Sequence, residues 1–414
     1  MLDGRFRYAV TLGGMRNLHG AWRRTAAGAG LLSSTGDVAP TIFAEISGLA
    51  ARTGAINLGQ GFPDEDGPAE VLEAARAAIL DGANQYPPGR GVPDLLHAIA
   101  EHQRRWYGLA VDPDREILVT AGATEAIAAA LLALVDGPAD EIVVFEPFYD
   151  SYAAIAALSG ATLRTVPLRL PDFQPDPAEL AAAVTDRCRV ILVNDPHNPT
   201  GAVLSPEIRA EIVRLATRHD AVIVTDEVYE HLAFTAPHVP LATIEGAAER
   251  TLTISSAGKT FSVTGWKIGW IHGPADLITA VLSVKQFLTY VNGAPFQPAV
   301  AAGLRLPDAF FTGAAERLRA KHDLLAEGLT AAGLEVHRPD GGYFTVADAT
   351  AIGGADAAAF CRALPERIGV AAIPLTAFVR PEHHARYRGL VRFAACKRPE
   401  VIAEAAARLA GLRG

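Results

Sequence analysis

Between Asp112 and about Pro274, short runs rich in β-branched residues alternate with longer runs that have helical periodicity. The strand candidates are residues 116–120, 141–145, 161–168, 189–193, 221–225, 251–255 and 267–272. Helical patterns separate several of them, for example at 124–135 and 206–219. Alternation of this kind predicts a mostly parallel sheet that helices cover on both faces.

The chain changes character after Pro274, where long helical stretches lead into a tail with a few short strands. The strand candidates of this tail lie within 335–348, 370–375 and 390–396. Because 414 residues exceed one ordinary domain, we predict an α/β protein with a large domain, whose mostly parallel sheet is flanked by helices, and a smaller α+β domain. The expected parts are a segment at 37–85 that contributes to the small domain and to an interface, the large domain at 86–300 and the small domain at 301–414.

The first 36 residues differ from the rest, because five arginines accompany a single acidic residue, Asp3, among many Gly, Ala and Ser residues. A targeting leader would have an apolar segment followed by a cleavage site, and neither is clear in this stretch. We therefore expect residues 1–36 to be a disordered extension, or to include an upstream start before Met15, and we leave them out of the fold prediction.

Charge, hydropathy and cysteine content exclude several classes of function. The chain has 37 basic and 46 acidic residues and a net charge of −9, which argues against nucleic-acid binding. No apolar stretch reaches the length of a membrane span, and the run 126–135 is typical of a buried helix. The three cysteines, Cys188, Cys361 and Cys396, are far apart and show no metal-binding spacing. We expect a cytoplasmic protein with no metal site, in which the cysteines are packing residues in a reducing compartment.

Lys259 stands out within the stretch 255–270, which is rich in Gly, Ser and Thr. Only five of the 37 basic residues are lysines, and two of them, Lys259 and Lys267, lie in this stretch. Arginine stays protonated and cannot act as an amine nucleophile. Lysine can do so once its surroundings lower its pKa, as Schiff-base lysines show. For Lys259 taken alone, chance placement is an equally good explanation.

A carboxylate and a phenol follow one of the predicted strands. Asp226 comes directly after the run 221–225, and Tyr229 follows three positions later. Ligands of open α/β sheets bind at the carboxyl ends of the strands. Pyridoxal phosphate (PLP) needs an amine for its aldehyde, an anion for its ring nitrogen and a donor near its ring oxygen. Lys259, Asp226 and Tyr229 provide one each, although an aspartate after a strand is by itself more often a helix cap or turn residue.

The turn at 122–126 is a candidate phosphate site. Its small residues leave backbone N–H groups open at a helix start, where Thr124 adds a hydroxyl. The same residues also describe an ordinary capped helix. Ser256 and Lys267 would bring a hydroxyl and a positive charge to the same phosphate.

Two other loops offer contacts to a planar ring. Tyr149, within 146–152, can stack on such a ring or can be an ordinary core aromatic. Asn198 lies in 194–201, which has the Asn-Pro and Pro-Thr-Gly sequences of a sharp turn. Its amide could donate to a ring oxygen.

Eight motifs occur in order along the chain: NLGQGFPD (57–64), NQYPPG (84–89), GATEA (122–126), EPFYDSY (146–152), HNPTG (197–201), TDEVYE (225–230), SSAGKTFSVTGWKIGW (255–270) and VRFAACK (391–397). In this combination they resemble the class I, fold-type-I, PLP-dependent aminotransferases. The resemblance covers roughly residues 38–412, and HNPTG, TDEVYE and SAGKTF are highly specific together. It implies PLP as the cofactor and an amino acid and a 2-oxo acid as the substrates.

The resemblance also implies a role for each residue of these motifs. Lys259 would bind the PLP aldehyde and Asp226 would pair with the ring nitrogen. The other residues implied to contact PLP are Ala123, Thr124, Ser256 and Lys267 at the phosphate, Asn198 and Tyr229 at the ring hydroxyl, and Tyr149 on the ring face. Arg392, which taken alone is more typical of a surface salt bridge, would clamp the substrate α-carboxylate beside the Gly61 backbone and Asn198. Tyr86 would reach the neighbouring subunit's site in a homodimer.

The substrate is left between two branches of the family. Four motifs are similar in sequence to those of actinobacterial-type N-succinyldiaminopimelate aminotransferases: NLGQGFPDEDGP, NQYPPG, GATEAIAAA and EPFYDSY. This resemblance implies N-succinyl-LL-2,6-diaminopimelate and 2-oxoglutarate as the substrates, in lysine biosynthesis. Lys267, where many members have arginine, matches the kynurenine/glutamine transaminase branch. A kynurenine, glutamine, aromatic or methionine aminotransferase, or a cysteine-conjugate β-lyase, is therefore the alternative. A non-catalytic PLP-binding regulator is a remote alternative, because it would need a DNA-binding module for which the first 36 residues leave no room.

Overall fold

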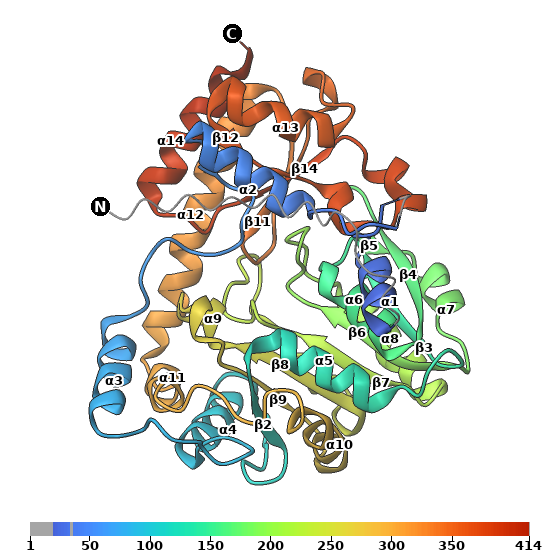
Figure 1. The fold of residues 1–414 in the computed structure, drawn as a ribbon, viewed down its shortest axis with the longest axis vertical. Helices are drawn as coiled ribbons and strands as arrows, with labels where there is room; N and C mark the ends of the chain where they lie inside the picture. Colours follow the sequence, from blue (N-terminus) through green and yellow to red (C-terminus); the bar gives the residue numbers. More distant parts are fainter. Residues whose placement is uncertain (1–19, 34–35, 414) are drawn as a thin grey trace.

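An eight-stranded sheet forms the centre of the larger part of the computed structural model, which describes residues 20–33 and 36–413 (Figure 1). From edge to edge its strands are β2 (Ile117–Thr120), β9 (Gly269–His272), β8 (Thr251–Ser256), β7 (Val222–Asp226), β6 (Cys188–Asn194), β3 (Glu141–Glu146), β4 (Thr162–Arg169) and β5 (Gln174–Pro175). The strands from β8 to β4 pair in parallel, whereas β9 is antiparallel to both of its neighbours and β5 is antiparallel to β4. The predicted α/β class is confirmed, and all seven strands expected between 116 and 272 belong to this sheet.

Alternate residues of the strands pack on opposite faces of the sheet, as period-two geometry requires. Ile142 and Val144 belong to one apolar cluster, and Val143 and Phe145 belong to another. The first cluster includes residues of α5 (Gly122–Leu134), α6 (Asp150–Ser159) and α10 (Ala275–Lys285). The opposite face is covered by α7 (Pro177–Ala183) and α8 (Pro206–Arg218), and near β2 and β9 by α3 (Ala69–Leu80), α4 (Pro93–Tyr107) and α11 (Phe296–Leu304). Burial on both faces explains why the strands are almost wholly apolar.

One predicted strand boundary was wrong. The run expected at 267–272 becomes β9 only at Gly269, because Lys267 has a φ of 56°, in the left-handed region that a strand cannot contain. A Cβ on Gly269 would lie 2.7 Å from the carbonyl carbon of Gly122, so glycine is needed where β9 passes the start of α5.

The smaller part of the molecule contains a four-stranded antiparallel sheet. Its order is β10 (Glu335–His337), β11 (Phe344–Asp348), β14 (Leu390–Ala394) and β13 (Ile373–Pro374). The helices of this part are α12 (Asp308–Ala332), α13 (Ala357–Ile368) and α14 (Pro399–Ala410), and α12 packs along α14. The strands expected in the C-terminal tail are therefore present, whereas the domain boundaries stay a prediction.

The N-terminal segment joins both parts of the molecule. Its helix α2 (Ile42–Thr53) packs against α13, and β1 (Ile56–Asn57) pairs in parallel with β12 (Val370–Ala371). Figure 1 shows α2 in blue among the orange and red C-terminal elements. Within 1–36, residues 20–33 contain helix α1 (Ala21–Gly28), which packs on α6, so the expected disorder does not hold there. The rest of that expectation lies outside the described residues.

Two expectations from composition can be compared with the fold. Within residues 20–33 and 36–413, no helix is long and apolar enough to cross a membrane. The apolar run 126–135 lies largely in α5, which is buried against the sheet. Cys188, Cys361 and Cys396 are all buried and form no disulfide.

Candidate active site

A cavity of about 510 Å³ opens at the carboxyl ends of the central strands. Eleven of the twelve residues that the sequence singled out line it: Gly61, Ala123, Thr124, Tyr149, Asn198, Asp226, Tyr229, Ser256, Lys259, Lys267 and Arg392. The cavity wall also includes Thr41, Phe43, Gln60, Asn194, Phe344 and Phe378, to which the sequence assigned no contact with cofactor or substrate. Groups from both parts of the molecule and from the N-terminal segment therefore meet in one place.

Lys259 is directed into the cavity by a short helix, α9 (Ala257–Thr260), that begins where β8 ends. Ser256 caps this helix by accepting a 3.2 Å hydrogen bond from the Gly258 N–H. The Lys259 ammonium donates a 3.0 Å hydrogen bond to the Gly61 carbonyl. Burial lowers the pKa of Lys259 from its ordinary value, against the opposing effect of the nearby Asp226 carboxylate. A lowered pKa is what an amine nucleophile requires.

Asp226 is the last residue of β7 and is almost fully buried. Its Oδ2 accepts a 2.6 Å hydrogen bond from the phenol of Tyr152, whereas its Oδ1 is buried with no hydrogen-bond partner among the described residues. Burial raises the pKa of Asp226 to about 6, although the Tyr152 hydrogen bond and the Lys259 charge act in the other direction. A buried acceptor left open toward a cavity indicates a ligand that carries a donor.

Two residues that position Asp226 were missed by the sequence analysis. Tyr152 lies in α6, three residues after Tyr149 in the same motif, and this helical spacing was the available signal. Asn194 ends β6 directly opposite Asp226 in the strand register. Its side-chain amide donates a 2.7 Å hydrogen bond to the Asp226 carbonyl, and its Oδ1 accepts a 2.6 Å bond from the Asn198 N–H. Asn194 therefore ties the turn that carries Asn198 to the strand end that carries Asp226.

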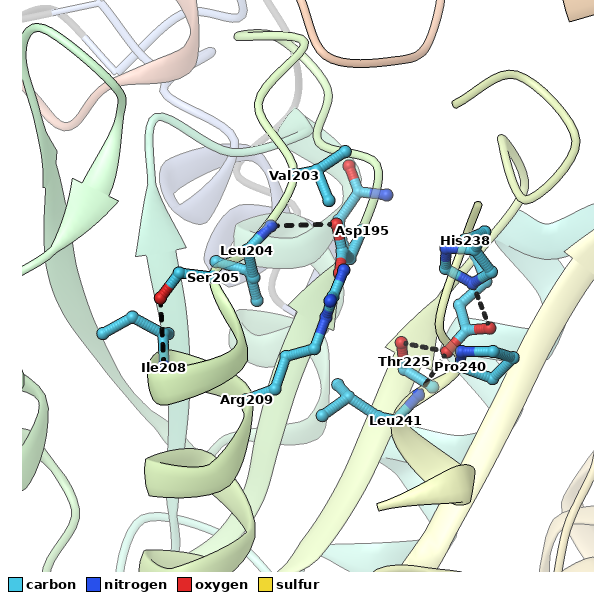
Figure 2. A network of polar contacts seen from close by, with 12 residues as sticks. Asp195, Val203, Leu204, Ser205, Ile208, Arg209, Thr225, His238, Pro240 and Leu241 are labelled. Carbon is cyan, nitrogen blue, oxygen red and sulfur yellow. Dashed lines mark hydrogen bonds and ion pairs between the residues drawn. The ribbon is translucent and has the colours of Figure 1, made fainter. Parts of the chain in front are cut away.

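The residue after each of these two strand ends is a buried acid, and hydrogen bonds hold it in place; Figure 2 shows those of Asp195. Asp195 accepts hydrogen bonds of 3.0 and 2.8 Å from the guanidinium of Arg209 and one of 3.2 Å from the Leu204 N–H. Glu227 accepts hydrogen bonds from Thr225, His238 and the Leu241 N–H. Because Asp195 follows Asn194 and Glu227 follows Asp226, these contacts help to fix the positions of Asn194 and Asp226 in the cavity wall.

The start of α5 forms a positively charged corner of the cavity. Ala123 and Thr124 lie in its first turn, where backbone N–H groups and the helix dipole favour an anion. A Cβ added to Gly122 would lie 3.4 Å from the Lys267 Nζ, so the ammonium lies against this helix start. With Ser256 also on the wall, the donors suit a phosphate group.

Arg392 reaches the cavity from β14 of the smaller sheet. Its guanidinium donates hydrogen bonds of 2.7 Å to the Gly59 carbonyl and 3.1 Å to Oδ1 of Asn198. Its central carbon lies 3.9 Å from the centre of the Phe344 ring and 4.4 Å from that of Phe378. Burial lowers the pKa of Arg392 to about 9, which leaves it charged at neutral pH. The surface salt bridge that its sequence position suggests is thus not what the structure contains.

Tyr149 and Tyr229 also line the cavity. Tyr149 directly precedes the first residue of α6, and burial raises its pKa. Tyr229 packs edge-on against Tyr343, with ring centres 5.1 Å apart, and burial raises its pKa as well. Both phenols therefore stay protonated at neutral pH and are available as donors.

Tyr86 is the one predicted site residue outside this cavity. It is 81% exposed, and its ring makes an edge contact with Tyr290 at a centre-to-centre distance of 5.5 Å. Phe287 and Leu288, close in sequence to Tyr290, are also exposed. The role expected for Tyr86 in a neighbouring subunit stays a prediction.

The chemistry of the cavity fits PLP. The open Oδ1 of Asp226 suits a protonated ring nitrogen, the corner at α5 suits a phosphate, and the amine of Lys259 lines the same cavity. The family model for aminotransferases of class I and II matches residues 53–409. The chain is a class I and II aminotransferase.

Relatives of this aminotransferase are similar over nearly their whole length. A probable N-succinyldiaminopimelate aminotransferase, DapC, of Mycobacterium tuberculosis is 53% identical over 90% of this chain and 96% of its own. A methionine aminotransferase of Escherichia coli is 39% identical over 89% and 95%, and kynurenine–oxoglutarate transaminase 3 of Mus musculus is 36% identical over 87% and 85%. The solved structure of the M. tuberculosis N-succinyldiaminopimelate aminotransferase superposes with a TM-score of 0.87, at 54% identity, over 90% of this chain and 97% of that one. The expectations of a PLP-dependent transaminase and of its fold are confirmed.

Proposed function

We propose that this aminotransferase moves an amino group between N-succinyl-LL-2,6-diaminopimelate and 2-oxoglutarate, a reaction of lysine biosynthesis. The observation that carries the proposal is the 53% identity to the M. tuberculosis protein, which exceeds the 39% and 36% identity to the methionine and kynurenine enzymes. The high coverage of both chains supports it, because the similarity extends over nearly the whole of each chain.

In this proposal Arg392 binds the α-carboxylate of the substrate. A guanidinium matches a carboxylate with two parallel hydrogen bonds. Its Nε is buried without a partner in the described part of the chain, which leaves a donor for an incoming acceptor. The Gly61 backbone lies beside this position, where a Cβ would meet the Phe344 ring at 2.4 Å.

Lys259 and Asp226 have different roles in the proposed proton transfer: Lys259 moves the proton, and Asp226 stabilises the protonated ring nitrogen. PLP, when bound, supplies an electron sink for the charge that develops at the substrate Cα. Lys259 would hold the cofactor, and its amine would take the proton from the substrate Cα and return a proton as general base and acid. Asp226 keeps the ring nitrogen protonated, because a nearby anion favours the charged form of a base.

The remaining predicted residues orient the cofactor. Ala123, Thr124, Ser256 and Lys267 bind the phosphate, Tyr149 stacks on the ring, and Asn198 and Tyr229 contact the ring hydroxyl. Fixed donors of this kind act without reorganisation during the reaction. Their common position on one cavity wall supports these roles.

The proposed assembly is a homodimer in which Tyr86 enters the partner's site. Contiguous exposed apolar side chains commonly mark an interface, and Tyr86 touches Tyr290 near the exposed Phe287 and Leu288. A two-fold arrangement would give each subunit the contact that it provides. The cytoplasmic location stays a prediction.

A second candidate function has its own support in the cavity wall. Phe43, Phe344 and Phe378 surround the guanidinium of Arg392, and aromatic walls suit aromatic or thioether side chains. A kynurenine, glutamine, aromatic or methionine aminotransferase, or a cysteine-conjugate β-lyase, is therefore the alternative.

A comparison of amino donors separates the two functions. The holoenzyme is mixed with N-succinyl-LL-2,6-diaminopimelate, kynurenine, methionine or glutamine, and the loss of the lysine-bound cofactor's visible absorbance is followed. We expect the highest kcat/KM for the diaminopimelate derivative, with 2-oxoglutarate as the acceptor. A higher kcat/KM for kynurenine or methionine, or release of pyruvate from a cysteine conjugate, would favour the alternative.

A further inference from the structure

A second cluster of chemically active side chains lies outside the cofactor cavity. His102 comes from α4, and Glu230 and His231 come from the turn after β7. One donor atom of each lies within 4.8 Å of the other two, and the Nε2 atoms of the two histidines are 2.8 Å apart. His102 and Glu230 are buried, whereas His231 is partly exposed, so solvent can reach the cluster. None of the three lines the cavity that holds Lys259.

The surroundings of the cluster orient its donor atoms. Ser255 and Tyr107 donate hydrogen bonds of 2.5 and 2.8 Å to the two oxygens of Glu230. The His231 ring packs 4.5 Å from Phe311 and 4.8 Å from Trp106, measured between ring centres. Hydrogen-bonded ligands inside an apolar shell are typical of metal centres in proteins.

The two imidazoles are hydrogen-bonded to each other through their Nε2 atoms, so one of these nitrogens carries the shared proton. A bound metal would replace that proton, and both Nε2 lone pairs would then point at one position beside the carboxylate.

We propose that His102, Glu230 and His231 form a binding site for a divalent transition metal of the Zn²⁺ type. Two imidazoles and one carboxylate are a known zinc ligand set that leaves a fourth position for water. Zinc–nitrogen bonds of about 2.0–2.1 Å at a tetrahedral angle place two nitrogens roughly 3.3 Å apart. The separation of 2.8 Å therefore needs only a small widening, and the carboxylate oxygen, which lies within 4.8 Å of both nitrogens, would move toward them.

A metal at this site would stabilise the segments that support the catalytic cavity and would not contact the substrate. Glu230 and His231 directly follow Tyr229, and Ser255, which bonds to Glu230, precedes Ser256. A bound ion would fasten α4 to the turn after β7 and to the end of β8. No spacing motif indicated a metal site, because His102 and His231 are 129 positions apart and lie on different elements.

Titration of the PLP-loaded enzyme with Zn²⁺ tests the site. After dialysis against a chelator, calorimetry should detect one Zn²⁺ per chain, and X-ray absorption of the zinc-loaded wild type should show two imidazole nitrogens and carboxylate oxygen. His102→Gln and His231→Gln should each weaken binding at least about tenfold, since even loss of outer-shell partners costs 10–100-fold. His97→Gln, on an exposed position of the same helix, is the matched control and should bind like the wild type.

Each other result overturns the proposal. These are no binding to the wild type, equal binding by the two cluster variants and the wild type, or an absorption spectrum with sulfur or a single imidazole. If a cluster variant does not fold, the wild-type spectrum decides alone. The result does not bear on the transamination proposal, because substrate preference is measured separately on the chelator-treated holoenzyme.

Discussion

Tyr152 forms a hydrogen bond with only one of the two carboxylate oxygens of Asp226, and the other oxygen is left open for a ligand. The phenol of Tyr152 donates to Oδ2 at 2.6 Å, and Oδ1 is buried without a hydrogen-bond partner in the described chain. A carboxylate buried in this way is costly unless a cation meets it. The protein therefore carries an unfavourable charge at the place where we propose that the protonated cofactor ring binds.

Tyr152→Phe should reduce turnover without weakening substrate binding. Removing the phenol takes a hydrogen bond from the charged form of Asp226, so the pKa of Asp226 should rise. A larger fraction of Asp226 should then be neutral and unable to keep the ring nitrogen protonated. A hydrogen bond to a charged group contributes about 1.5–3 kcal/mol, so kcat should fall roughly 10–100-fold at unchanged KM. The pH profile of kcat should shift upward on its acidic side. Tyr387→Phe, which removes a buried phenol outside the cavity, should leave that profile in place.

Asp226→Asn should stabilise the cofactor-free protein while it abolishes transamination. The pKa of Asp226 is raised from 3.8 to about 6, so the folded state binds more protons than the unfolded state in that window. The free energy of unfolding therefore falls as the pH rises from about 4 to 6, by on the order of 3 kcal/mol. Asparagine removes this loss, and urea unfolding at pH 5 and pH 8 measures the part of it that lies above pH 5, about 1.4 kcal/mol. The exposed Asp114→Asn should keep the wild-type pH dependence, and an Asp226 variant that keeps it too would contradict the argument.

Lys259 should be the residue that carries the cofactor. The purified protein should be yellow, and reduction with borohydride should fix the cofactor to the peptide that contains Lys259, as read by mass spectrometry. Lys285 is an internal control, because it is also buried but donates to the Tyr290 carbonyl outside the cavity. Labelling of Lys285 or Lys267 in place of Lys259 would remove the central assignment.

Arg392→Ala should raise KM for both the amino donor and the oxo acid. Loss of one partner of a buried charge pair costs about 2–5 kcal/mol, which appears in kcat/KM. Arg392→Lys should recover only part of this, because an ammonium lacks the planar fork. The matched control is Arg398→Ala, since Arg398 is exposed and pairs with Asp64 and Glu400. Kinetics that stay normal in Arg392→Ala would place carboxylate binding elsewhere.

Mixed dimers test Tyr86. Lys259→Ala and Tyr86→Ala subunits should each have little activity alone, but a mixed dimer should regain one intact site. That site combines Lys259 of one subunit with Tyr86 of the other. Subunit exchange is followed with a tagged chain, so that a failure to mix is recognised. Exchange without recovered activity would show that Tyr86 does not act across the interface.

Much of the architecture could be predicted because it depends on local patterns. The strands at 116–272 are apolar on both faces and end in polar turns, so their positions and their common edge were readable. The choice of Asp226 followed from that edge, and the choice of Lys259 followed from the rarity of lysine in the chain and the motifs around it. The start of β9 was misplaced because the backbone of Lys267 depends on its contact with the α5 corner, which is not local.

Other parts of the site depend on contacts between distant segments. Arg392 lies 194 positions from Asn198, and only the family resemblance connected it to the cavity. The Tyr152 bond to Asp226 spans 74 positions and had a weak helical signal. The three aromatic rings around Arg392 come from α2, β11 and the segment before β14, so no single motif contains them. Helix α1 was missed because its stability depends on packing against α6, not on its own composition.

The pairing of β1 with β12 has a consequence for the order in which parts of the chain can fold during synthesis. Ile56 lies beside Val370, so the N-terminal segment waits for its partner strand until nearly the whole chain has left the ribosome. At about 5–20 residues per second this delay is roughly 15–60 s, during which the apolar face of α2 has nothing to cover it. A nascent chain with such an exposed face is a natural client for chaperones, and the sheet of the larger part can form well before the smaller part closes over the cavity.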